Sequence, residues 1–354
     1  MDTTTRPTLE SVAQRAGVSR QTVSNVLNSP HLVRPGTTDR VRAAIEELGY
    51  RPSAAARQLR TGRSRVVGLR LEPVRDGING AVLDRFLHTL TESAQARGYR
   101  VMLFTAPDDE HEIAQYSELL DTADLDAFVL TSTHRADARA AWLAEREVPF
   151  VTFGRPWDRP DPEARTAGAA GATGTADDHP WVDVDGAAGT RAAVAHLRGL
   201  GHERIAYLGW PDGSDVGEDR ASGWAAAMVD AGHDAGLLRR LHARVPDGVA
   251  AGAQAIERVL ADAAPTAVVC ASDSLALGAL TVGRNRATPL AVVGFDDTPV
   301  AAAVGLTSVA QPLTEAAHRA LDLLLDQLDG TEGARSRHVL LAPHLMERTS
   351  SHLL

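Results

Sequence analysis

Two short helical patterns joined by the turn AGVS (residues 16–19) constrain the fold of this chain more than any other stretch. Before the turn, apolar residues recur at helical spacing and predict one buried helix face, formed by Leu9, Val12 and Ala13. Gly17 supplies the backbone freedom that a tight turn between helices needs. Ser19 stands where an N-cap belongs, with its hydroxyl available to the backbone N–H groups of the next helix.

The second pattern, residues 20–28, has an apolar face and a polar face. Val23, Val26 and Leu27 point inward at helical spacing. The polar residues left outside can all hydrogen-bond a base edge or a phosphate; they are Arg20, Gln21, Ser24, Asn25 and Asn28. A third helix is predicted to follow, capped by Thr37 or Thr38. The pattern therefore predicts a helix-turn-helix with a polar recognition face.

About fifty residues carry a family resemblance, TLESVAQRAGVSRQTVSNVLN (8–28) and TTDRVRAAIEELGYRPSAAARQL (37–59). This segment resembles the DNA-binding headpiece of the lactose-repressor (LacI/GalR) family of bacterial transcription regulators. The resemblance implies that Arg20, Gln21 and Asn25 read bases, although many members carry a basic residue where this chain has Asn25. It also implies phosphate or register contacts from Thr8, Ser19, Thr22, Ser24 and Asn28.

The stretch Ser53–Arg60 is short and Ala-rich, and an isolated helix of this length is marginal in water. By resemblance it is the hinge helix, which in the family orders only on operator DNA. Leu59 matches the leucine wedge that opens a base step in the minor groove, and Ala56 matches the small residue beside it. We therefore expect a helix-turn-helix domain at 1–52, a hinge and linker at 53–63, and an effector-binding and dimerisation core at 64–354.

From residue 66 onward, short aliphatic runs alternate with longer amphipathic stretches. The runs are VVGLRL (66–71), VMLF (101–104), AFVLT (127–131), FVTF (150–153), RIAYLG (204–209), AVVCA (267–271) and LAVVGF (290–295). This alternation predicts βαβ units on parallel sheets, and there are too many units for one small sheet. The arrangement resembles the family's periplasmic-binding-protein-like core of two α/β lobes. The Pro/Gly/Ala-rich segment 155–180 is predicted to be a mobile surface loop near the crossover.

Ligands of such sheets bind beyond the carboxyl ends of the strands, where several polar and aromatic residues of this chain stand. By resemblance the candidate effector-binding residues are Phe86, Arg155, Trp181, Arg220, Ser272, Asp273 and Asp296. His134 is a further candidate because it stands at another strand end, where the alternative is an ordinary polar surface residue. Ser272 departs from the usual Asn of the family motif. The family's Pro-aromatic-aromatic pattern is absent before Phe86, where the chain reads AVLDRF (81–86).

The predicted site favours a carbohydrate. Aromatic faces suit sugar C–H groups, and Arg and Asp suit hydroxyls. Four of the five Trp residues fall in the region that bears the Arg motifs, namely Trp157, Trp181, Trp210 and Trp224. We therefore expect a mono- or oligosaccharide inducer, with a purine-type corepressor as the alternative. A sugar-binding protein or sugar-processing enzyme with the same core is the competing class, although a headpiece would have no use there.

Composition separates the two ends of the 354-residue chain, whose net charge is −10. Residues 1–65 hold 11 Arg against 5 acidic residues, and residues 66–354 hold 25 Arg against 41. A basic end on an acidic body is the expected layout when one end must meet DNA phosphates. The single cysteine excludes an intrachain disulfide. No secretory signal or membrane-spanning run is evident, so we expect a cytoplasmic protein.

Enzyme motifs are missing from the sequence. There is no Walker loop, no HExxH, and the nearest approach to GxSxG, GSDVG (213–217), has its Ser misplaced. The acidic run DDEHE (108–112) fits the first turn of a helix better than a metal site, and Cys270 fits a buried thiol. No leucine-heptad tail follows the core. The sequence therefore predicts a homodimeric DNA-binding regulator with no cofactor, metal or catalytic residue.

Overall fold

The computed structural model describes residues 7–51, 62–71, 78, 80–157, 179–331 and 336–352. The chain divides into two compact units, residues 1–64 and 65–354, and each has its own buried hydrophobic residues. The predicted hinge helix with Ala56 and Leu59 lies outside the described residues, as does most of the predicted surface loop at 155–180.

The first unit is helical, which confirms the predicted fold of the N-terminal end. It contains α1 (Leu9–Ala16), α2 (Arg20–Asn28), the short 3-10 helix η1 (Pro30–Leu32) and α3 (Pro35–Leu48). Gly17 ends α1 in the left-handed region at φ 65°, where a side chain would be strained. Ser19 caps α2 by accepting a hydrogen bond from the backbone N–H of Thr22 over 3.1 Å. The helices close over a core that includes Val12, Val23 and Val41.

The start of α3 differs from the prediction. We expected Thr37 or Thr38 to cap it, but the N-cap is Arg34 in extended backbone, three or four residues earlier, and the helix begins at Pro35. Proline is pre-organised for a first helical position because its φ is fixed and it has no N–H to satisfy. Thr38 is instead buried inside the first turn, where its hydroxyl donates to the carbonyl oxygen of Arg34.

The second unit is built on two six-stranded sheets. The first sheet is wholly parallel and has the order β11-β5-β4-β3-β1-β2, with strands β1 (Val66–Arg70), β2 (Arg100–Phe104), β3 (Ala127–Leu130), β4 (Phe150–Phe153), β5 (Trp181–Val184) and β11 (His338–Leu341). The second has the order β12-β10-β9-β8-β6-β7, with strands β6 (Ile205–Gly209), β7 (His242–Arg244), β8 (Ala267–Cys270), β9 (Ala291–Phe295), β10 (Thr307–Ala310) and β12 (His344–Met346). In that sheet β12 alone is antiparallel, to β10.

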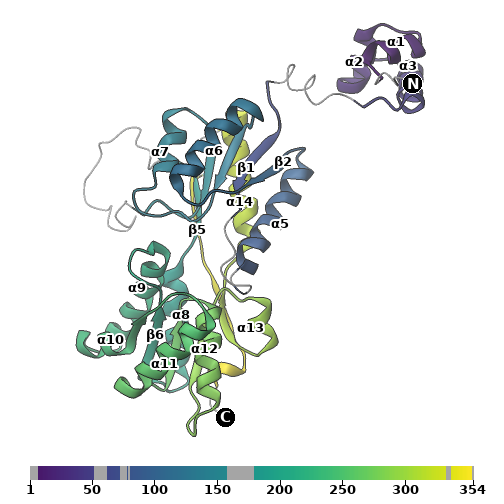
Figure 1. Cartoon of the computed structure of the whole chain (residues 1–354). Coiled ribbons are helices and arrows are strands. Elements are labelled where there is room, and N and C mark those ends of the chain that lie inside the picture. The colour runs from purple at the N-terminus through teal and green to yellow at the C-terminus, as the bar shows by residue number, and fades with distance from the viewer. Residues whose placement is uncertain are drawn as a thin grey trace, which may run out of the picture. The chain divides into compact units, whose positions relative to one another are not determined.

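Helices pack around each sheet and complete two lobes (Figure 1). The first lobe carries α5 (Gly80–Ala96), α6 (Asp109–Thr122), α7 (Ala138–Glu145) and α14 (Leu313–Asp329). The second lobe carries α8 (Gly186–Gly199), α9 (Asp215–Asp230), α10 (Ala235–Leu241), α11 (Val249–Ala263), α12 (Asp273–Arg284) and α13 (Pro299–Ala303). This confirms the predicted two-lobed α/β core with parallel sheets.

The chain passes between the lobes three times, after β5, after β10 and after β11. The second crossing matters most for packing because α14, which follows the second-lobe strand β10, returns to the first lobe. Its apolar face, with Ala316, Ala320 and Leu324, is buried in the core that also contains Val67 of β1 and Val151 of β4. None of the helices in the described part of the chain is long and apolar enough to cross a membrane.

Close helix packing in the second lobe generates a stability prediction. A Cβ atom at Gly278 of α12 would lie 2.1 Å from the carbonyl oxygen of Val249 and 2.5 Å from the backbone nitrogen of Ala253, both on α11. Backbone atoms cannot swing aside, so Gly278→Ala should lower the free energy of unfolding by about 1–3 kcal/mol. Urea denaturation followed by circular dichroism measures this change.

The matched control is Gly199→Ala at the end of α8, where an added Cβ would meet nothing within 4 Å. Its unfolding free energy should stay within about 0.5 kcal/mol of the parent value. Equal stability of the two variants would contradict the packing assigned to α11 and α12.

Candidate functional site

The surface of α2 carries the residues predicted to read bases. Arg20 and Gln21 are exposed in its first turn, and Asn25 is half-buried one turn later. Gln21 Nε2 donates to Asn25 Oδ1 over 3.0 Å, so the two amides form one polar unit. Arg20 forms an exposed ion pair with Glu10 of α1, 3.3 Å from Nε to Oε2. Exposed ion pairs contribute little to folding stability, so Arg20 can exchange Glu10 for guanine or phosphate.

The residues predicted to contact phosphate lie at the helix starts or along α2. Thr8 caps α1 in a reciprocal capping box. The Ser19 and Thr22 hydroxyls are 2.9 Å apart at the start of α2. Near the end of that helix, Asn28 Nδ2 donates to the carbonyl oxygen of Ser24 over 2.7 Å. These side chains hold the backbone of a surface helix and can take register contacts on a duplex.

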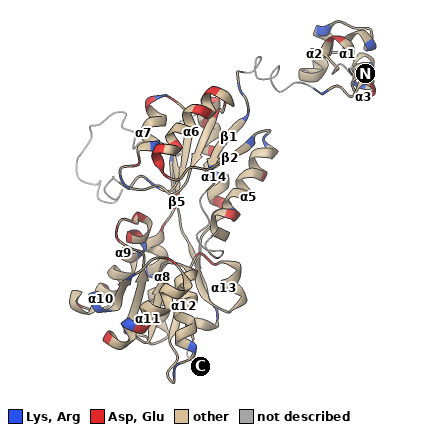
Figure 2. Ribbon diagram, in the orientation of Figure 1, with Lys and Arg blue, Asp and Glu red and all other residues tan. Residues whose placement is uncertain are grey.

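Acidic residues are numerous on the second unit, as the charge count indicates. Figure 2 shows them on α6 and α9, among other elements. The acidic positions of α6 include three in its first turn, and those of α9 include Asp215 and Glu218. Such a surface repels phosphate, so the basic first unit is the part of the chain suited to DNA.

The second lobe gathers a buried polar cluster around Arg220 of α9. This guanidinium is buried, donates to the carbonyl oxygen of Ala271 over 2.5 Å, and lies 3.4 Å from Asp296 Oδ1. It also stacks 3.7 Å from the ring centre of Phe295 and lies 5.2 Å from that of Trp210. Its Nε has no hydrogen-bond partner among the described residues. A buried donor without a partner is costly, and a ligand oxygen would satisfy it.

Asp296 follows β9 in an unusual backbone conformation. Its φ is 106° and that of Asp297 is 49°, so two successive non-glycine residues have left-handed backbone, a form of strain that clusters at ligand sites. Asp296 Oδ1 also accepts from Gln311 Nε2 over 2.7 Å. Burial raises the pKa of Asp296 to about 7, although the positive charge of Arg220 opposes the shift.

A second carboxylate, Asp247, joins the cluster and was not among the predicted residues. Its Oδ1 accepts from Trp210 Nε1 over 3.0 Å and from Ser272 Oγ over 2.5 Å. Asp247 follows β7, a three-residue strand without an apolar run, so periodicity does not reveal the strand end. Trp210 follows β6 and Gln311 follows β10. Trp210 is among the tryptophans that favour a carbohydrate but was not predicted as a site residue, and Gln311 was not predicted at all.

Asp273 sits under the cluster and its carboxylate is engaged by the protein. Its oxygens accept from the backbone N–H of Thr298 at 2.7 Å, the Thr298 hydroxyl at 2.9 Å and the Ser308 hydroxyl at 2.6 Å. Burial raises its pKa to about 6, and these hydrogen bonds oppose the shift. These hydrogen bonds tie Asp273, at the start of α12, to Thr298 and to Ser308 of β10.

Arg155 joins the two lobes. Following β4 of the first lobe, its Nε is 2.6 Å from Asp183 of β5 and its Nη2 is 3.1 Å from Asp219 of α9. A second bridge lies beside it, because Arg135 pairs with Asp215 at 3.0 Å through Nη2 and donates its backbone N–H to the same carboxylate. Both second-lobe carboxylates belong to α9, the helix that carries Arg220.

Three predicted effector residues are not brought to the Arg220 cluster. Phe86 is a core residue of the first lobe, 1% exposed and stacked on Phe153 with ring centres 4.5 Å apart. Trp181 begins β5, is buried and stacks on His338 of the adjacent strand β11. His134 follows β3 and pairs with Asp109 at 2.8 Å in the first lobe.

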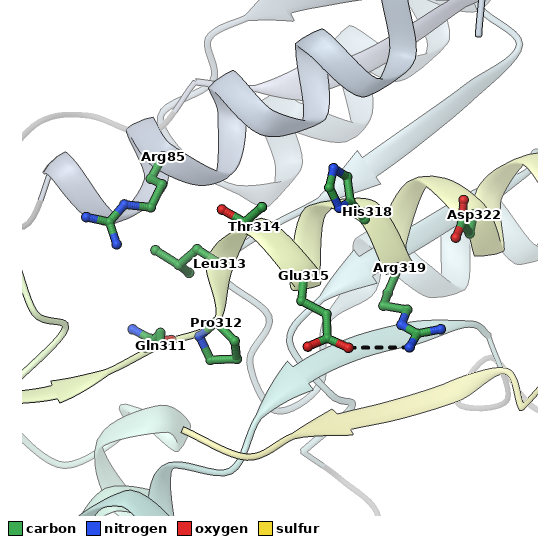
Figure 3. A pocket seen from close by; sticks show the side chains of 9 residues that line it. All are labelled: Arg85, Gln311, Pro312, Leu313, Thr314, Glu315, His318, Arg319 and Asp322. Carbon is green, nitrogen blue, oxygen red and sulfur yellow. Dashed lines mark hydrogen bonds and ion pairs between the residues drawn. The ribbon is translucent and has the colours of Figure 1, made fainter. Parts of the chain in front are cut away.

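A groove of about 540 Å³ begins at the cluster and runs beside the first turns of α14 (Figure 3). Gln311 belongs to both, because its amide contacts Asp296 and its side chain lines the groove. The other lining residues are Arg85 of α5 and Pro312, Leu313, Thr314, Glu315, His318, Arg319 and Asp322. Glu315 and Arg319 pair along one wall, 3.3 Å apart. This volume is within the range of small-molecule sites.

The acidic run at 108–112 begins α6, as we predicted, with Asp108 as its N-cap. Asp109, His134 and Asp137 lie close enough together to hold a metal ion. However, the Arg139 guanidinium is 3.6 Å from Asp109 and 2.7 Å from Asp137, and so already supplies a cation to both carboxylates. The chemistry of this cluster is that of an ion-pair network around the buried Arg139.

Comparison with known proteins agrees with this architecture. Residues 8–53 match the family model for bacterial regulatory proteins of the lacI family, and residues 194–351 match that for a periplasmic binding protein-like domain. The HTH-type transcriptional regulator CelR of Thermobifida fusca is 35% identical, over 99% of this chain and 100% of that protein.

Solved structures give the same result. A transcriptional regulator CelR–cellobiose complex is 31% identical with a TM-score of 0.67, over 98% of this chain and 100% of that one. A LacI-family regulatory protein from Chloroflexus aggregans is 33% identical with a TM-score of 0.70, over 82% of this chain and 99% of that one. These relatives are regulators and not enzymes. The chain belongs to the lacI family of DNA-binding bacterial transcriptional regulators.

Proposed function

We propose that this regulator is a cytoplasmic, homodimeric repressor released from a palindromic operator by a mono- or oligosaccharide inducer. The α2 surface reads the operator, and the Arg220 cluster binds the sugar. Residues 53–63 form the hinge between these functions, with Leu59 as the wedge and Ala56 beside it. The observation that carries the sugar assignment is the buried Arg220 with its unsatisfied Nε, placed among two carboxylates and two aromatic rings.

The chemistry of the cluster suits a polyhydroxylated ring. Arg220 donates, whereas Asp247 and Asp296 accept, so neighbouring hydroxyls can be held from both sides. Trp210 is partly exposed, and its Nε1–H is held by Asp247, so the indole plane is fixed for stacking on sugar C–H groups. The likeness to the CelR–cellobiose complex supports the same class of ligand.

The same helix offers a route from ligand to DNA. Arg220 faces the ligand cluster, while Asp215 and Asp219 of α9 hold Arg135 and Arg155 of the first lobe. A ligand that displaces α9 therefore changes the bridges between the lobes. Through the hinges of a dimer, this change would alter operator affinity by a typical coupling factor of about 5- to 150-fold.

Base reading by α2 is tested at a palindromic operator selected from a random library. Gln21→Ala removes one amide of the Gln21–Asn25 unit, and we expect it to lose about 1–3 kcal/mol of discrimination at the base it reads. Fluorescence anisotropy with matched and singly mismatched duplexes measures this loss.

The control is Gln14→Ala, which truncates an exposed glutamine of α1 and should leave both affinities unchanged. Binding of the parent protein should weaken steeply with salt because phosphate contacts release counterions. Micromolar or weaker binding that does not depend on salt would refute the repressor assignment.

The effector site is tested by Arg220→Gln, which removes the positive charge and some of the N–H donors of the guanidinium group. Loss of its charge-assisted hydrogen bonds should weaken sugar binding by about 10- to 150-fold while operator binding persists. Calorimetric titration with cellobiose and other mono- and disaccharides, then with purines, identifies the ligand class. Release of the operator complex by the ligand is followed by anisotropy.

Because Arg220 is buried, its replacement could disturb the lobe, and Trp210→Ala provides an independent test at a partly exposed position. This variant should also lose affinity, since a stacking face is gone. Arg319→Ala, in the groove but outside the cluster, is the control. Purine binding with no response to any sugar would overturn the saccharide proposal and leave the DNA-binding assignment intact.

A further inference from the structure

The second lobe holds a group of metal-binding side chains apart from the Arg220 cluster. His196 lies in the last turns of α8, Glu347 follows β12, and His352 follows the 3-10 helix η4 (Thr349–Ser351). Their ligand atoms lie within 4.8 Å of one another. Gly186 of α8 lies next to the Arg220 cluster, because a Cβ atom added there would meet Asp219 and Arg220. His196 is ten residues further along the same helix, a distance of about 15 Å.

The donor set has the chemistry of a zinc site. Two imidazole nitrogens and a carboxylate oxygen form a common ligand set of Zn²⁺, with water in the fourth position. His196 Nδ1 is 3.7 Å from Glu347 Oε1. Tetrahedral bonds of about 2.0–2.1 Å place neighbouring ligand atoms about 3.3 Å apart. Glu347 and His352 are exposed, and small rotations of their side chains would supply the difference.

The opposite side of the His196 ring has the partner that a metal ligand needs. Its Nε2 is 2.9 Å from Ser351 Oγ, and the Ser351 hydroxyl can donate to the carbonyl oxygen of Arg348 at 3.2 Å. Ser351 Oγ can therefore accept a hydrogen bond from Nε2–H, which leaves the Nδ1 lone pair facing Glu347. Such an outer partner fixes ring orientation and tautomer in metal sites.

We propose that His196, Glu347 and His352 form a zinc-binding site that fastens the C-terminal segment, residues 344–352, to α8. This segment supports the effector-bearing sheet, because β12 pairs with β10 and Ser350 Oγ donates to the carbonyl oxygen of Val292 in β9 over 2.7 Å. The first-lobe group around Asp109 differs, since Arg139 already neutralises its carboxylates. Zinc at the C-terminal site would thus stabilise the second lobe through mass action.

The test uses the full chain without an affinity tag, stripped with a chelator and titrated calorimetrically with Zn²⁺ alone. We expect one site of micromolar or tighter affinity, and visible absorption typical of tetrahedral coordination when Co²⁺ replaces zinc. Glu347→Gln and His352→Ala should each weaken this site by at least about tenfold. Zinc should raise the melting temperature of the parent protein and not that of His352→Ala.

His344→Ala is the matched control, because His344 is an exposed histidine of the same segment and is not one of the three ligands. It should bind zinc as the parent does. A further variant, His134→Ala, keeps the C-terminal site and reports any binding at the first-lobe group. Parent protein that binds zinc only at millimolar concentration would overturn the proposal, as would parent-like affinity in both Glu347→Gln and His352→Ala.

Discussion

The buried guanidinium of Arg220 is the interaction on which the second lobe depends. Moving a charge out of water costs several kcal/mol, and only partners of good geometry offset that cost. Here the offset comes from the Ala271 carbonyl, the Asp296 carboxylate and the face of Phe295. The compensation is incomplete, because Nε has no partner in the described part of the chain. The lobe therefore folds with an interaction left over for a ligand.

Helix α9 places this charge beside the contacts between the lobes. Asp215 and Asp219 are four residues apart and so share one helix face, where each accepts an arginine from the first lobe. Burial raises the pKa of Asp219, and the charge of Arg155 opposes this shift. A movement of α9 that separates these two ion pairs would expose the charged side chains to water or leave them buried without a partner. One helix thus carries both Arg220 and the two carboxylates that pair with the first lobe.

Structural features that depend on a residue and its sequence neighbours alone could be predicted from the sequence. Gly17 and Ser19 determine a turn and a cap by their own backbone and side-chain preferences, and the aliphatic runs 127–131 and 267–271 contain strands found in the structure. Features that depend on tertiary contacts, such as the strands β5 and β7, could not be predicted in this way. The strand β5 contains Asp183, which breaks its apolar run but is tolerated because Arg155 pairs with it. Likewise β7 is only three residues long and concealed Asp247.

Burial separates the aromatic residues that were candidates for ligand contact. Phe86 and Trp181 have the residue type of a ligand wall, yet each stacks on another ring, Phe153 and His338, inside the first lobe. Trp210 instead stands half-buried after a strand end, with its only polar atom held by Asp247. An indole whose N–H is satisfied and whose face is partly open can contribute stacking without a desolvation cost. Trp210 belongs to the same lobe as Arg220, and its ring centre lies 5.2 Å from that guanidinium, so the partly open aromatic face and the donor without a partner stand in one compact unit.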